Sequence, residues 1–160
     1  MSLPMAKIAA RILTGAPQRS YDQPLDRMLD LAQITPLCAV AVAGPEAAEA
    51  MCGLWRRGYE RVECARRATC PAADEQCDLL MVAGCDRAEA AGRIVRDTRA
   101  MLTACGQVII DAGRMSDPDE RLKLCGLLAE AGFAIGPDAH LAPEILARPP
   151  VRTCGGLKVA

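Results

Sequence analysis

Apolar residues follow two different patterns on either side of residue 36. Before it, they recur at helical spacing in two short stretches, 5–13 and 25–32. After it, continuous apolar runs alternate with segments of helical periodicity. We therefore expect one compact domain, in which a helical segment at 1–35 precedes an α/β part at 36–160.

The continuous apolar runs predict a sheet whose strands are buried on both faces. Leu37–Ala43 and Leu79–Ala83 are apolar at every position, which is typical of parallel strands covered by helices. Alternating strands and helices imply right-handed crossovers and a helical layer on each side of the sheet. The predicted fold class is a three-layer α/β domain. Its strands are expected at residues 38–43, 60–65, 79–83, 107–111, 133–136 and 152–159.

Glycines and capping residues predict where the helices begin and end. Gly58 and Gly132 stand where a left-handed residue closes a helix. Asp86 and Glu89 have the spacing of a capping box, and the helix after them is expected to continue to Cys105. The paired glycines 155–156 predict a bulge in the last strand.

Composition and charge narrow the classes of function. Hydrophobic residues make up 51% of the 160 residues, the formal net charge is -1 and aromatic residues make up 2%. A disordered chain is excluded, and we expect no nucleic-acid partner because neither a basic field nor a stacking platform is present. The nine cysteines are odd in number and include no C-x-x-C pair. We therefore expect no metal site, reduced thiols, no membrane span and a cytoplasmic location.

Three segments late in the chain carry a family pattern. They are an apolar strand preceded by Asp at 77–83, a helix end with a Gly turn before a strand at 99–110, and a helix end with a Gly-Phe turn at 127–133. In this order they resemble the Rossmann-like S-adenosylmethionine-dependent methyltransferases. The resemblance implies a mainly parallel sheet and makes 151–160 a last antiparallel strand, inserted between the two strands before it. A receiver-like domain, suggested by residues 58–62, is the competing topology.

The resemblance also implies where a cofactor would bind. The turn after the first strand contributes Gly44 and Glu46, the second strand contributes Glu63, and the turn after the third contributes Gly84 and Asp86. These are the candidate cofactor-binding residues.

This chain departs from the family pattern at the donor turn. Gly44 is the single glycine there, and Pro45 after it has no amide hydrogen to donate. Arg66 follows the second strand where the family has an acid. We therefore predict an eroded site, no cofactor and a non-catalytic role through a protein partner or a homodimer. The alternative is an active S-adenosylmethionine-dependent methyltransferase.

Other candidates have simpler interpretations. His140, the single histidine, lies in an expected loop with no nucleophile beside it, and Asp111 ends the fourth strand. An arginine-rich stretch around the second strand predicts a solvated face. No catalytic residue is assigned. The expected contact surface is either Trp55, Arg56 and Arg57 or the early stripe Ile8, Ile12 and Leu13.

Overall fold

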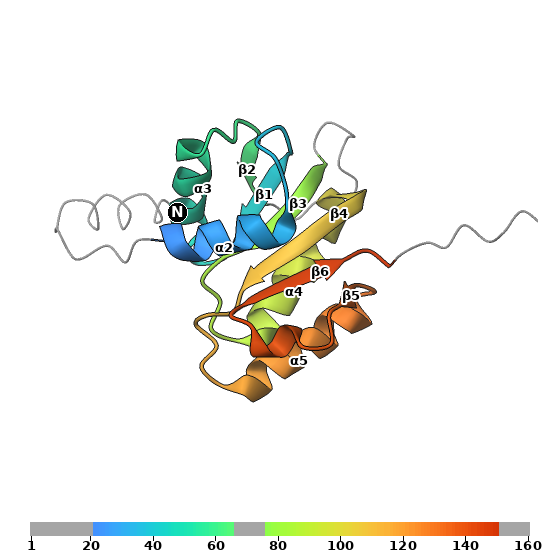
Figure 1. Ribbon diagram of the computed structural model, residues 1–160. Coiled ribbons are helices and arrows are strands. Elements are labelled where there is room, and N and C mark those ends of the chain that lie inside the picture. The colour runs from blue at the N-terminus through green and yellow to red at the C-terminus, as the bar shows by residue number, and fades with distance from the viewer. Residues whose placement is uncertain (1–20, 66–75, 151–160) are drawn as a thin grey trace, which may run out of the picture.

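The computed structural model describes residues 21–65 and 76–150, which form a six-stranded sheet between two pairs of helices (Figure 1). Within these ranges, every helix is too short or too polar to cross a bilayer. The helices are α2 (Asp22–Ala32), α3 (Ala47–Arg56), α4 (Ala88–Thr98) and α5 (Pro118–Glu130), with short 3-10 turns η2 (Arg99–Met101) and η3 (Ala139–Leu141). The strands are β1 (Val40–Ala43), β2 (Val62–Cys64), β3 (Cys77–Val82), β4 (Leu102–Asp111), β5 (Ala134–Ile135) and β6 (Glu144–Arg148).

The sheet has the order β2-β1-β3-β4-β6-β5. Neighbours from β2 to β4 run parallel, whereas β6 pairs antiparallel with both β4 and β5. The predicted α/β class, with a mainly parallel sheet and a late antiparallel strand, is confirmed.

The antiparallel strand is β6, which begins before the residues predicted for it. The expected strand at 152–159 and its bulge lie outside the described residues. No strand was predicted at 144–148, and Pro143 and Pro149 flank the strand found there. Here the prolines stand just outside the strand, where no ladder hydrogen bond is lost.

The segment before β4 was also predicted incorrectly. The helix expected to reach Cys105 ends at Thr98, whose hydroxyl donates to the Ile94 carbonyl oxygen at 2.7 Å. The chain then turns through η2 and enters a strand of ten residues. The ladder to β3 shifts between the pairs Cys77 with Leu102 and Leu79 with Gln107, so β4 is irregular near its start.

Alternate side chains of the strands fill two cores, one on each face of the sheet. Val40 and Val42 of β1 pack with α2 and α3, whereas Ala41 packs on the side of α4 and α5. Figure 1 shows the two helix pairs on opposite faces. Helix α2 buries Leu25 and Met28 completely, so this helix packs into the same core as the sheet.

Helix α4 is capped by a residue distant in sequence. The Ala88 amide donates to Glu120 Oε2 of α5 at 2.8 Å, and Arg87 at the N-cap position makes no side-chain cap. The capping box predicted from Asp86 and Glu89 is therefore wrong, because Glu89 pairs with Lys123 instead. Helix α5 has a local cap, since Asp117 Oδ1 accepts from the Asp119 amide at 2.9 Å.

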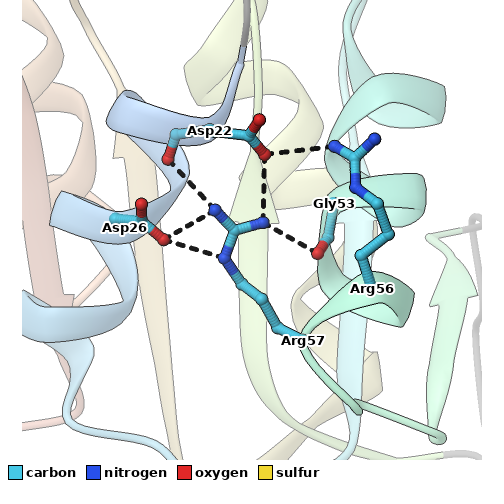
Figure 2. Close-up of polar contacts among 5 residues, drawn as sticks. All are labelled: Asp22, Asp26, Gly53, Arg56 and Arg57. Carbon is cyan, nitrogen blue, oxygen red and sulfur yellow. Dashed lines mark hydrogen bonds and ion pairs between the residues drawn. The ribbon is translucent and has the colours of Figure 1, made fainter.

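Arg57 joins α2 to the end of α3 (Figure 2). Its guanidinium donates to Asp26 Oδ1 through Nε at 2.8 Å and to Asp22 Oδ1 at 3.2 Å. It also donates to the Gly53 carbonyl oxygen at 2.9 Å. The neighbouring Arg56 makes one bond to Asp22 at 3.1 Å and is 66% exposed, compared with 23% for Arg57.

We predict that Arg57→Ala lowers the free energy of unfolding by about 1 to 3 kcal/mol, because several charge-assisted bonds are lost together. The matched variant Arg56→Ala removes a single exposed pair and should cost less than about 1 kcal/mol. Urea denaturation of both variants measures the difference. Equal losses in the two variants would contradict the role assigned to Arg57.

Candidate functional site

Two glycine turns meet at the carboxyl ends of β1 and β3. The two strands pair in register up to Ala43 and Val82, and Gly44 and Gly84 follow with positive φ angles of 102° and 78°. A Cβ on Gly44 would lie 2.2 Å from the Ala83 carbonyl oxygen, which is far inside contact distance. Only glycine permits this approach. The Glu46 amide donates to the same oxygen at 3.2 Å and holds the two turns together.

The side chain of Glu46 covers the second turn. A Cβ on Gly84 would lie 2.6 Å from Glu46 Cγ, so the glycine leaves room for that side chain. The Glu46 carboxylate forms an ion pair with Arg114, which lies in the loop after β4. Residues from three separate loops therefore close over the ends of β1 and β3.

A second group of charges lies beside this pair, at the ends of β4 and β6. Asp111 is 5% exposed and Glu144 is 7% exposed, and the two face each other across the antiparallel ladder. Tyr21 donates its hydroxyl to Asp111 Oδ2 at 3.1 Å, and the Arg27 Nε donates to Glu144 Oε1 at 2.6 Å. Burial, and then the Asp111 charge, raise the pKa of Tyr21 well above its ordinary value. These contacts fix the start of α2 over the sheet edge.

Both oxygens of Asp111 are engaged, since the Gly113 amide donates to Oδ1 at 2.9 Å. The nearby Cys85 is 2% exposed, and burial raises the pKa of its thiol to about 11, with Asp86 and Asp111 adding to the shift. The thiol is therefore protonated at neutral pH. As placed, the Cys85 thiol does not serve as a nucleophile, and the Asp111 carboxylate does not serve as a free base.

The structure brings together three of the five predicted cofactor-binding residues. Gly44, Glu46 and Gly84 lie in contact. Glu63 pairs opposite Ala41, three residues before the Gly44 turn, and its charge acts on Cys77 near the other end of β3. Asp86 is exposed two residues beyond Gly84.

Several residues at this edge were missed by sequence reasoning. They are Tyr21, Arg27, Arg114 and Glu144. Their partners lie between 68 and 117 residues away in the chain, so no local spacing could have indicated them. That Asp111 and Glu144 lie opposite each other at one end of the β4–β6 ladder becomes visible only when the strand pairing is known.

The remaining candidates are scattered. His140 lies in η3, before β6, and the arginines of 66–75 lie outside the described residues. Among residues 21–65 and 76–150, no three His, Cys, Asp or Glu side chains form a group that could hold a metal ion. A broad cavity of about 930 Å³ lies at the start of β4, lined among others by Arg99, Phe133 and Arg148. It is at the opposite end of the strand from Asp111 and does not reach the glycine turns.

Comparisons with known proteins identify the fold. No family model and no curated protein sequence matches the chain. Solved structures do match: an S-adenosylmethionine-dependent O-methyltransferase from Thermotoga maritima superimposes with a TM-score of 0.57 at 14% identity, over 89% of this chain and 70% of that one. The fold is that of a Rossmann-like methyltransferase. The N-methyltransferase NodS from Bradyrhizobium japonicum, in complex with S-adenosylhomocysteine, matches with a TM-score of 0.50 at 13% identity, over 91% of this chain and 97% of NodS.

These comparisons correct one expectation. The sequence analysis predicted no cofactor, on the ground that the donor turn departs from the family pattern. The prediction is contradicted, because the matched structures are S-adenosylmethionine-dependent enzymes and one of them contains the reaction product of that cofactor. The single glycine Gly44, the proline after it and Arg66 in place of an acid were too little ground for excluding a ligand.

The close approach at Gly44 gives a stability prediction. We expect Gly44→Ala to lower the free energy of unfolding by about 3 kcal/mol or more, because a positive φ and a backbone clash add. Gly58→Ala is the matched control: its φ is 83°, but a Cβ there would meet nothing within 4 Å. The control should lose about 1 kcal/mol. Thermal or urea unfolding measures both, and similar losses would show that the two turns are not in tight contact.

Proposed function

We propose that this methyltransferase-like domain binds S-adenosylmethionine at the carboxyl ends of β1 and β3 and acts in methyl transfer. The observation that carries the proposal is the position of the two glycine turns. The chain passes from β1 to β2 on one side and returns to β3 on the other, so the switch in strand order falls between β1 and β3. Open α/β sheets bind ligands at that point, outside the carboxyl ends of the strands.

The residues at the switch point fit the cofactor in part. Gly44 and Gly84 keep the backbone free of side chains there. The Ala47 amide at the start of α3 already donates to the Gly44 carbonyl oxygen at 3.2 Å, so the amides available to a ligand are those that follow it in the first turn. These groups would hold the amino-acid end of the cofactor, which when bound supplies an electrophilic methyl group. The Glu46 side chain covers Gly84, so a ligand fits only after this side chain moves aside.

Two features of the turn support weak binding. Pro45 lacks the amide that an anion at this turn would use, and one lost bond to a charged group corresponds to roughly 1.5 to 3 kcal/mol. Glu46 adds a negative charge at the start of a helix, where an anion would otherwise be favoured, and its ion pair with Arg114 offsets part of this repulsion. We infer that a site of about micromolar affinity becomes about ten to a hundred times weaker. The sequence analysis predicted a site that binds no cofactor, whereas we now propose a site that binds the cofactor weakly.

The test is calorimetric titration of the wild-type chain with S-adenosylhomocysteine. We expect saturable binding with a dissociation constant of about 10 to 100 µM. Gly84→Ala should weaken it, since the added methyl group pushes Glu46 across the turn, whereas Gly58→Ala, with comparable backbone strain and an open surrounding, should not. No saturable heat at 1 mM ligand, or equal binding in Gly84→Ala, would overturn the proposal.

A second candidate is a role in protein contacts, including self-association. It is favoured by Trp55, which is 51% exposed on α3. The contact surface predicted from the sequence included Arg57. In the structure Arg57 forms ion pairs with Asp22 and Asp26, so the surface around Trp55 is smaller than predicted. Trp55 would then be the centre of the contact, as aromatic anchors often are.

Light scattering tests this second candidate. If the chain self-associates through α3, the wild type should show the mass of a dimer and Trp55→Ser the mass of a monomer at the same concentration. Leu122→Ser, which alters another exposed apolar residue on a different helix, is the control and should leave the mass unchanged. A monomeric wild type would remove the argument for a homodimer.

A further inference from the structure

The ion pair between Glu46 and Arg114 stands apart from the other charged contacts of this edge. Asp111 and Glu144 are buried and bonded to groups on α2 or its start. Glu46 is 19% exposed and Arg114 is 50% exposed, and the pair joins two loops rather than two packed elements. It is therefore the contact at this edge that can open without disturbing the core.

The position of Glu46 decides what its opening would do. Its backbone is fixed, since the amide donates to the Ala83 carbonyl oxygen, while its side chain lies over Gly84. Rotation of the side chain alone would uncover the Gly84 turn and free the Arg114 guanidinium. The uncovered surface would then present a glycine turn, the start of α3 and an arginine.

We propose that Glu46 acts as a built-in competitor for this site: its carboxylate occupies Arg114 in place of the carboxylate of an amino-acid-bearing ligand, and binding exchanges one carboxylate for the other. The inference rests on the proposed function and adds to it a residue that sets affinity and a class of ligand group. The ligand must carry a carboxylate, because a neutral group has nothing to offer Arg114 in exchange for Glu46.

The energetic balance allows this exchange. A partly exposed pair of this kind shifts an equilibrium by no more than about fivefold, because water screens it and ordering two long side chains opposes it. A ligand carboxylate that brings further contacts from its nucleoside can therefore displace Glu46. Asp111 and Asp86 lie near Cys85 at the same edge and oppose a second anion, so the positive charge of Arg114 is needed by whichever carboxylate is bound.

The experiment compares two ligands and three variants of the full chain. S-adenosylhomocysteine carries the amino-acid carboxylate, and methylthioadenosine has the nucleoside and sulfur without it. Glu46→Gln keeps the length of the side chain over Gly84 and removes its charge. Arg114→Ala removes the cation. Glu89→Gln is the matched control, since it removes the acid of another exposed ion pair, with Lys123 on α5.

We expect Glu46→Gln to bind S-adenosylhomocysteine about fivefold tighter than the wild type. Arg114→Ala should bind it no tighter than the wild type, because this variant loses the ligand's partner together with that of Glu46. Both variants should bind methylthioadenosine as the wild type does, and Glu89→Gln should match the wild type for both ligands. Circular dichroism and the unfolding midpoint establish that the variants are folded.

The outcomes separate this inference from the proposed function. If the wild type binds S-adenosylhomocysteine and Glu46→Gln binds it equally well or more weakly, Glu46 is not a competitor and only this inference fails. A weaker Glu46→Gln would instead make Glu46 a partner of the ligand's ammonium group. If neither the wild type nor Glu46→Gln binds S-adenosylhomocysteine, both proposals fail. If Glu46→Gln gains equally for the two ligands, the exchange does not depend on a carboxylate and the inference is overturned.

Discussion

The contact between the Gly44 turn and the Ala83 carbonyl oxygen is the constraint on which the carboxyl edge of this fold depends. Two parallel strands run in register to their last residues, so their following turns must occupy neighbouring space. The absence of a side chain at Gly44 is what lets them do so. The same contact directs the chain into α3 over one face of the sheet. The position of Glu46, and through it that of Arg114, follows from this one backbone approach.

A second constraint acts beside the glycine turns, where β4 ends and β6 begins. Helix α2 precedes the sheet in the chain, yet it packs against β4 and β6, which come last. Its apolar residues enter the core beside β1 and β3, while Arg27 and the preceding Tyr21 bond to buried acids at the ends of β4 and β6. Burying Asp111 and Glu144 would be costly without these partners. The helix and the acids therefore depend on each other, and together they shape the edge beside the glycine turns.

Most of the fold could be predicted because the central strands β1 and β3 carry continuous apolar runs. The strand Val40–Ala43 and the run from Leu79 onward are unambiguous in this respect, and Gly58 and Gly132 adopt the positive φ angles expected of helix ends. Local patterns failed where tertiary contacts override them. Helical periodicity extends past Thr98, yet the chain there pairs with β3, and the cap of α4 comes from Glu120 on α5. In the candidate site, Gly44, Gly84 and Glu46 could be predicted because they lie in the turns that follow strands. Arg114 and Tyr21, which bind Glu46 and Asp111, could not be predicted in this way.

The error about the cofactor has a physical origin that bears on how such turns are interpreted. Viewed in the turn sequence alone, Pro45 and Glu46 are each unfavourable to an anion at the start of a helix. In the folded chain the charge of Glu46 is balanced by Arg114, which is 68 residues away in sequence. The edge therefore holds a compensated pair rather than a lone negative charge. A ligand carboxylate that replaces one member of such a pair adds no net charge to the site while Glu46 turns out to solvent, so electrostatic repulsion is a much smaller obstacle than the turn sequence alone suggests.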